Sequence, residues 1–274
     1  MRNMISGEFY KLRKSKCFYV CILTVAVLVL LLYGTLAMID KIRTGQRENG
    51  QNGIIVTEEV KKSEEPFMDQ IGIMGVIQEM FSGHFLDFVL VVFISMFVIR
   101  EYTDGAVKNI VGKGYSREKI FFSKLLTVLA ATVILSLITA AVIVLLGMIF
   151  MGKEGLEALI WKDVMIYLGL QILFAIVVTS ITVLVSELFR SLAAGISISM
   201  GIVIFSTSLT AALDLLFHRL GWKPSRYWIL DLQTECPVGD FKGEFLTRGI
   251  AVSLIWFGLA VLAGTIHFKR ADVK

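Results

Sequence analysis

The sequence predicts an all-α membrane protein, a single polytopic domain over residues 1–274 that crosses the bilayer about six times. Hydrophobic residues make up 56% of the chain and the mean hydropathy is +0.75, far above the values of soluble domains. Charged residues are clustered, which leaves several long uncharged stretches. Each stretch, as a helix that rises 1.5 Å per residue, can cross roughly 30 Å of hydrocarbon.

The uncharged stretches place the membrane spans in order along the chain. The first follows a basic flank, as a signal peptide does, but it is longer than a signal core, so we expect it to be retained. The second is the weakest, because His84 and Asp87 lie near its start, and it can begin earlier, around Gly75. The expected spans are 17–38, 83–99, 125–151, 164–186, 192–216 and 249–267.

Charge distribution predicts the orientation. Lys and Arg are denser in the N-terminal segment, in 100–124, in 187–191 and in the C-terminal tail than in the other polar segments, and acidic residues show the opposite bias. Because basic residues stay on the cytoplasmic side, we expect both termini in the cytoplasm. Residues 1–16 are expected to form an amphipathic cytoplasmic helix at the inner membrane surface.

The outer segments are expected to be 39–82, 152–163 and 217–248. Residues 40–65 are polar and rich in Gly and Asn, so we expect them to be mobile. From Pro66 onward, apolar residues recur at helical spacing, which fits either a short helix on the outer surface or the early part of span two. In 217–248, aromatic residues suit the headgroup level; they are Trp222, Tyr227 and Trp228.

No catalytic, metal or cofactor site is expected. His84, His218 and His267 lack the spacing of a metal motif, and Gly112-Lys113 is not part of a Walker motif. The cysteines, Cys17, Cys21 and Cys236, suggest no disulfide framework. Asp87 and Asp214 lie near outer span ends within reach of water, so no charge is expected near the midplane. Ion-coupled transport is therefore disfavoured.

Neutral polar residues inside the spans allow two interpretations. They can form interhelical hydrogen bonds, or they can line a translocation path. The candidate path residues are Gln171, Thr179, Thr182, Ser199 and Ser206. Span five also carries small residues every fourth position, which serve either internal packing or a subunit interface; the two rows are Ala193, Ser197 and Gly201, and Ser191, Gly195 and Ser199.

Residues 100–124 predict a cytoplasmic elbow. The segment has charges of both signs, glycines at 105, 112 and 114, and Ser116 placed to cap a helix that leads into span three. Such an elbow either docks a soluble partner or is a plain basic loop that satisfies the orientation rule.

Two motifs carry a family resemblance. The elbow reads Glu101-Tyr102-x-x-Gly105-x-x-Lys108-Asn109, then Ser116-Arg117-x-x-Ile120 and Ser123-Lys124-Leu125. The N-terminus reads Glu8-x-x-Lys11-Leu12-x-Lys14-Ser15. This pattern, with six spans and cytoplasmic termini, resembles permeases of type-2 ATP-binding-cassette exporters. Gly114-Tyr115 stands where many members have proline, which is similar to bacitracin-resistance and lantibiotic-immunity permeases.

The resemblance implies the transmembrane subunit of an ATP-driven exporter in the plasma membrane. A separate cytoplasmic ATPase would dock on the elbow and the N-terminal helix, and a second permease copy or homologue would complete the path. The chain itself would be no enzyme and would need no cofactor or nucleic acid. The implied coupling residues are Glu101, Gly105, Lys108, Ser116 and Arg117, and those of the interfacial helix are Glu8, Lys11 and Lys14.

By the same resemblance, 217–248 would form an outer gate. The lack of deep charge fits an apolar or amphipathic cargo, such as a peptide antibiotic or a lipid-like molecule, and hence a role in antimicrobial resistance. The alternatives are a non-transporting sensor or assembly scaffold, and a secondary transporter or intramembrane enzyme.

Overall fold

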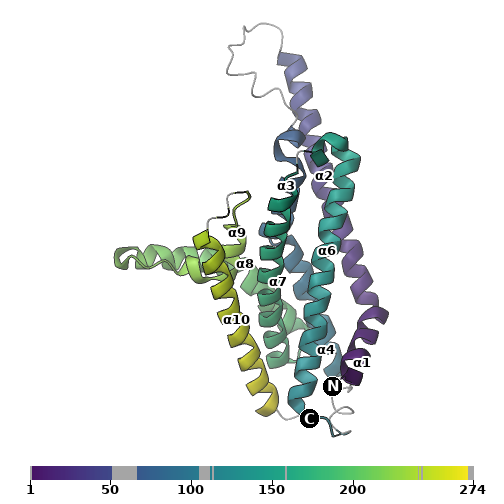
Figure 1. Ribbon diagram of the computed structural model, residues 1–274, viewed down its shortest axis with the longest axis vertical. Helices are drawn as coiled ribbons and strands as arrows, with labels where there is room; N and C mark the ends of the chain where they lie inside the picture. The colour runs from purple at the N-terminus through teal and green to yellow at the C-terminus, as the bar shows by residue number, and fades with distance from the viewer. Residues whose placement is uncertain are drawn as a thin grey trace.

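The computed structural model is an elongated bundle of helices whose two termini lie at the same end (Figure 1). We call this end, at the bottom of Figure 1, the lower end, and the opposite end the upper end. The structure describes residues 2–50, 67–104, 112, 114–157, 159–239, 241 and 243–270, and no strand occurs among them.

Five of the described helices are long and apolar enough to cross a membrane, and a sixth span is made by a bent pair. The five are α2 (Lys16–Gly50), α6 (Arg117–Glu157), α7 (Trp161–Phe189), α8 (Leu192–Phe217) and α10 (Gly243–Arg270); the bent pair is α3 (Phe67–Ser82) with α4 (Phe85–Thr103). The remaining elements are α1 (Arg2–Lys14), α9 (Ile229–Thr234) and the 3-10 helices η2 (His218–Leu220) and η3 (Pro224–Tyr227). The all-α polytopic prediction is therefore confirmed.

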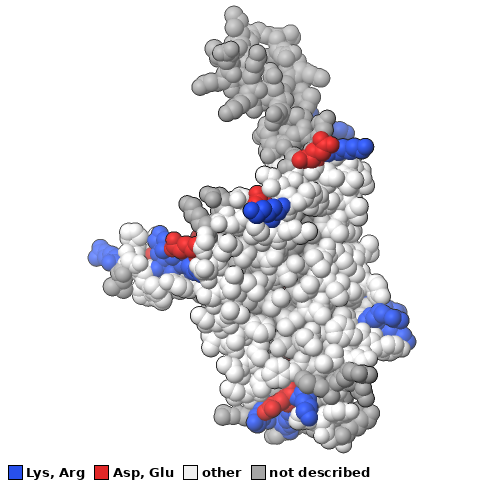
Figure 2. All heavy atoms as spheres, in the orientation of Figure 1, with Lys and Arg blue, Asp and Glu red and all other residues white. Residues whose placement is uncertain are grey.

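Charged side chains lie at the two ends of the bundle on the face seen in Figure 2, and a broad uncharged band separates them. Within that band, large apolar side chains are exposed along α2 and α6, including Leu23 at 64% and Leu145 at 60%. Such a surface is compatible with lipid and not with water.

The second span is broken, with α3 and α4 meeting at an angle of 41°. Gly83 and His84 form the break: a Cβ on Gly83 would lie 2.3 Å from the Glu79 carbonyl oxygen, and His84 has the left-handed φ of 61°. The inward side chains of α3 are at most 2% exposed, and α3 packs against α2 and α6. The stretch after Pro66 thus packs inside the bundle, and together with α4 it passes as one bent span.

Several expected loops are helical. Residues 40–50, part of the segment 40–65 that was expected to be mobile, continue α2 to Gly50, because a helix that leaves the membrane satisfies its own backbone whatever its side chains. Residues 51–66 lie outside the described residues. In the elbow, 100–103 belong to α4 and 117–124 to α6, while 105–111 and 113 are not described. The segment 217–248 holds η2, η3, α9 and the start of α10.

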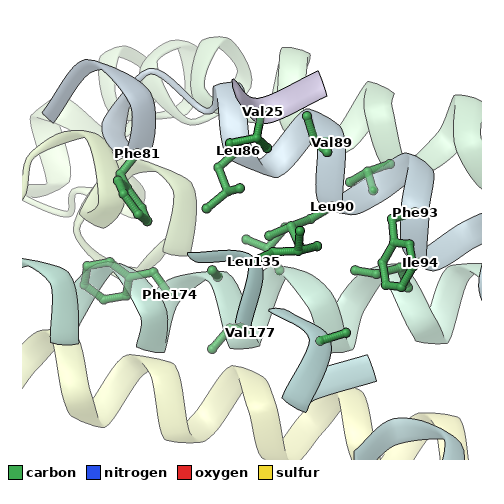
Figure 3. Packing of buried hydrophobic residues seen from close by; sticks show 14 of the residues in the cluster. Val25, Phe81, Leu86, Val89, Leu90, Phe93, Ile94, Leu135, Phe174 and Val177 are labelled. Atoms are coloured by element: carbon green, nitrogen blue, oxygen red, sulfur yellow. The ribbon is translucent and has the colours of Figure 1, made fainter. Parts of the chain in front are cut away.

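The hydrophobic core lies along α4 and α7, which pack against each other and against most of the other spans. Figure 3 shows how side chains from α2, α3, α4, α6 and α7 meet in this core. Its labelled members are Val25, Phe81, Leu86, Val89, Leu90, Phe93, Ile94, Leu135, Phe174 and Val177.

Helix α8 leaves the bundle at a steep tilt, and its upper end projects to the left in Figure 1. Leu215 and Leu216 near that end are 80% and 74% exposed. The two rows of small residues on α8 separate: Gly195 and Ser199 are buried inside the chain, whereas Ala193 and Ser197 face outward. One row thus serves internal packing, and the other leaves a face on which a second helix could lie closely.

Gly147 of α6 permits the close approach of α3 and α2. A Cβ there would lie 2.7 Å from Cγ1 of Ile73 and 2.8 Å from the hydroxyl of Tyr33, which itself donates a 2.9 Å hydrogen bond to the Ile143 carbonyl. Gly147→Ala is therefore expected to destabilise the protein by about 1–3 kcal/mol, although alanine is the better helix former. Thermal unfolding in detergent measures this.

The matched control is Gly169→Ala in α7, where a Cβ would meet nothing within 4 Å. This variant is expected to be neutral or slightly stabilised. Equal responses of the two variants would contradict close packing at Gly147.

Candidate functional site

A chain of buried ion pairs joins four helices at the lower end. Lys11 of α1 lies 2.8 Å from Glu8 Oε1 and 2.9 Å from Glu101 Oε1 at the end of α4. Lys124 of α6 lies 3.2 Å from Glu101 Oε2 and 3.0 Å from Glu187 Oε1 of α7. We call these five residues the lower charge cluster. Charges held in this way tie the four helices to one relative arrangement.

Burial makes the cluster sensitive to any missing partner. The side chains of Lys124 and Glu187 are 1% and 0% exposed, and that of Glu101 is 10% exposed. A charge desolvated to this degree needs an opposite charge and hydrogen bonds nearby. The cluster therefore persists only as long as the four helices stay together.

Aromatic rings complete the surroundings of Lys124 and Glu187. The Tyr102 hydroxyl donates a hydrogen bond to Glu187 Oε2. The ammonium of Lys124 lies 4.7 Å from the centre of the Tyr102 ring, and the guanidinium of Arg190 lies 5.0 Å from it. The Tyr102 ring thus lies close to two cations, which the negative face of an aromatic ring attracts.

Glu8 is the weakest member of the cluster. Burial and the nearby Glu101 carboxylate raise its pKa, although Lys11 opposes the shift. For Lys11, burial disfavours the charge, but the two carboxylates prevail and raise its pKa. Glu8 Oε2 is buried without a hydrogen-bond partner among the described residues. The ion pair that attaches α1 to the rest of the cluster is that of Lys11 with Glu101.

The predicted coupling and interfacial residues divide into four groups. Glu101, Glu8 and Lys11 meet in the cluster. Ser116 and Arg117 lie at the start of α6, where the Ser116 carbonyl accepts the Ile120 N–H and Arg117 donates to the Lys269 carbonyl at 3.3 Å. Lys14 is exposed at the end of α1. The fourth group, Gly105 and Lys108, lies outside the described residues.

Sequence reasoning missed two members of the cluster. Lys124 was quoted only as part of a motif, and Glu187 was assigned to a cytoplasmic loop. In the structure both lie inside helices, at positions that face each other across α6 and α7. The sequence did hold a signal for this pair: a lysine on α6 and a glutamate on α7 both lie at the lower end of an apolar run.

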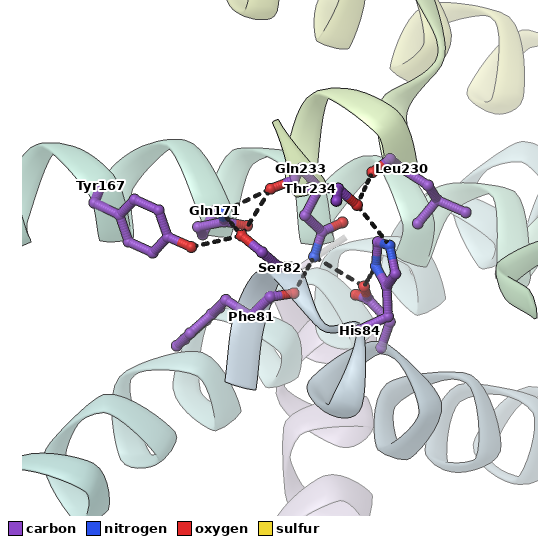
Figure 4. Close-up of polar contacts among 9 residues, drawn as sticks. Phe81, Ser82, His84, Tyr167, Gln171, Leu230, Gln233 and Thr234 are labelled. Atoms are coloured by element: carbon purple, nitrogen blue, oxygen red, sulfur yellow. Dashed lines mark hydrogen bonds and ion pairs between the residues drawn. The ribbon is translucent and has the colours of Figure 1, made fainter. Parts of the chain in front are cut away.

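A second polar network lies at the upper end, where α9 meets the break between α3 and α4 (Figure 4). Gln233 of α9 donates from Nε2 to Asp87 Oδ2 at 2.8 Å and to the Phe81 carbonyl at 3.1 Å. His84 Nδ1 lies 3.0 Å from the same Asp87 oxygen, and Ser82 donates to the Gln233 carbonyl at 2.9 Å. These contacts hold α9 across the break.

Asp87 corrects an expectation. It was expected within reach of water, but it is 0% exposed and Oδ1 has no partner among the described residues. The reason is that α9 folds back over the start of α4: Ile229, Leu230 and Leu232 are each at most 1% exposed. Asp214 does lie at the surface, where Ser225 donates to it.

Cys236, just beyond α9, is a free thiol and is buried. Burial raises the pKa of this thiol to about 12, so it stays neutral and unreactive at physiological pH.

The candidate path residues are separated in the structure. Gln171 belongs to the upper network, where its amide donates to Ser82 and to the Gln233 carbonyl. Thr179 shares a 2.9 Å hydrogen bond with Thr132. Thr182 and Ser199 line one cavity of about 10 Å³ between α7, α8 and α9, room for about one water molecule.

Ser206 of α8 is partly buried, and its hydroxyl has no partner among the described residues. Like Ser199, whose hydroxyl is also unpartnered, it lies on the helix that projects from the bundle. These two hydroxyls therefore leave hydrogen-bonding capacity on α8 that the described chain does not use.

Among the described residues, no group of three or more His, Cys, Asp or Glu could hold a metal ion. The lower charge cluster pairs two lysines with three glutamates and so links four helices. Such a site can transmit movement between helices.

A family model described as "ABC-2 family transporter protein" matches residues 4–206. This range includes the whole lower charge cluster and ends within α8. No curated protein matches the chain.

Proposed function

Because the chain belongs to the ABC-2 transporter family and is a membrane subunit of an ABC transporter, we propose that it forms one half of an ATP-driven exporter. The observation that carries the proposal is the lower charge cluster. It joins α1, α4, α6 and α7, and two of its members, Glu101 and Lys124, belong to the segment 100–124. A partner that moves this segment would therefore move four helices together.

In the proposed orientation the lower end is cytoplasmic. The position of both termini at one end supports an even number of spans. A separate cytoplasmic ATPase would dock on the lower end, with Ser116 and Arg117 at the docking surface and Glu101 transmitting the movement. Gly105 and Lys108 are proposed for the same surface on the family resemblance alone.

A second permease copy or homologue completes the path in this proposal. The outward row of small residues on α8, in which Ala193 and Ser197 are exposed, supports a place for it along α8. The proposed path residues are Gln171, Thr179, Thr182, Ser199 and Ser206. The uncharged band of the bundle is compatible with an apolar or amphipathic cargo.

Reversal of the charge on Arg117 tests the docking surface. Arg117→Glu is expected to lower the amount of co-purified ATPase per permease by about tenfold, or about 1.4 kcal/mol, because the reversed charge replaces an attraction at the interface by a repulsion. Affinity purification in mild detergent, with quantitative mass spectrometry and ATP hydrolysis, measures the effect.

Lys162→Glu, at the upper end, is the matched control and is expected to keep the ATPase. If both variants retained the ATPase and its stimulated hydrolysis, coupling would lie elsewhere. If the wild-type chain brought down no ATPase with a Walker motif, the transporter proposal itself would fail.

A further inference from the structure

A cavity of about 610 Å³ lies where the junction between α1 and α2 faces the lower part of α4. This junction is Ser15, the one residue between the two helices. Lys16, the next residue, begins the membrane span of α2. The cavity is therefore at the boundary between the polar lower end and the apolar band.

The cavity carries two cations that no described carboxylate neutralises. Of the four basic residues in its wall, Lys11 is paired within the lower charge cluster, and Arg100 Nε lies 3.4 Å from Asp104. Lys14 and Lys16 form no ion pair with a described residue; the ammonium of Lys14 lies 5.0 Å from the centre of the Tyr10 ring. Their charges are thus available to an anion.

The cavity wall also holds two carboxylates, Glu101 and Asp104, which are paired with Lys11 and Arg100. Figure 2 shows basic side chains at the right edge, where α1 meets α2, without an acidic one beside them on this face. An anion that approaches from this side therefore meets positive charge first.

Apolar surface continues upward from the basic mouth. Cys17, Met96 and Phe97 line the cavity on its membrane side. On α2, Val20, Leu23 and Val27 follow Lys16 by 4, 7 and 11 positions, which places them on one helix face, and they are 58%, 64% and 46% exposed. A molecule with an anionic head and a long apolar tail fits both parts.

We propose that this cavity binds the phosphate-bearing headgroup of an anionic lipid from the lower leaflet. Lys14 and Lys16 bind the phosphate, and the acyl chains lie along Val20, Leu23 and Val27. Basic pockets between membrane helices on the cytoplasmic side are suited to such headgroups. A soluble phosphate would use the same two lysines but not the apolar face of α2.

The test is a binding titration on the tagged full chain in mild detergent, with phosphatidylglycerol and phosphatidylcholine of identical acyl chains. The double variant with Lys14→Gln and Lys16→Gln is expected to bind phosphatidylglycerol about 25-fold more weakly. Each lysine near an anionic headgroup contributes roughly a factor of five to the affinity. Arg13→Gln with Lys119→Gln removes two exposed cations at the same end without touching the cavity. This control is expected to change binding less than threefold.

Three results would overturn the proposal. Equal weakening in the control would mean diffuse surface attraction, and displacement of phosphatidylglycerol by equimolar inorganic phosphate would mean a free-phosphate site. Loss of the co-purified ATPase from the Lys14 and Lys16 variant, with lipid binding unchanged, would assign the two lysines to a protein partner. The proposal is supported if the wild type binds phosphatidylcholine more weakly than phosphatidylglycerol and the Lys14 and Lys16 variant binds the two lipids equally.

Discussion

Replacement of Lys124 by methionine is expected to lower the free energy of unfolding by about 3–5 kcal/mol. The lysine side chain is 1% exposed and lies between Glu101 and Glu187. Without it, the Glu187 carboxylate, which is 0% exposed, loses its 3.0 Å ion pair and keeps the hydrogen bond from the Tyr102 hydroxyl. Thermal unfolding in detergent measures the loss.

Two further variants make the Lys124 experiment specific. Lys119→Met removes an exposed lysine five residues earlier on α6 and is expected to shift stability by no more than about 0.5 kcal/mol. Lys124→Met combined with Glu187→Gln removes the unpaired charge and is expected to recover most of the loss. If Lys124→Met unfolded like Lys119→Met, the buried ion pairs would not hold the helices together.

Replacement of Gln233 by leucine is expected to release α9 from the break between α3 and α4. The amide of Gln233 is the donor to both Asp87 and the Phe81 carbonyl, and its loss leaves a buried carboxylate with His84 alone. The expected destabilisation is about 2–4 kcal/mol, because a buried acceptor loses its partner and the acceptor is charged. Hydrogen exchange should accelerate in Ile229–Thr234.

Gln78→Leu is the matched control for this experiment. Gln78 is exposed on α3, about one turn before Ser82, so its substitution is expected to leave exchange in α9 unchanged. Unchanged exchange of α9 in Gln233→Leu as well would mean that apolar burial alone holds this helix.

The spans could be predicted because lipid imposes a simple requirement on composition. Every uncharged run long enough to cross the bilayer became a helix. Helix ends outside the membrane could not be predicted in this way: Asp40 and Lys41 stop an apolar run, but they do not stop α2. The apolar spacing after Pro66 left two placements open for α3, since a short apolar helix can be covered by neighbouring helices as well as by lipid.

The candidate site could be predicted only in part. Glu101, Glu8 and Lys11 were found through motifs, whereas the pairing of Lys124 with Glu187 depends on how α6 and α7 pack, which no local pattern specifies. Asp87 was misjudged because the six residues of α9 lie far away in the sequence. α9 brings Gln233 to that carboxylate, and the apolar side chains of Ile229, Leu230 and Leu232 on the same helix are at most 1% exposed.

The broken second span also affects how the protein is made. α3 finds one of its partners in α6, which the ribosome synthesises later. The packing of the bent pair is therefore completed only after α6 has been made.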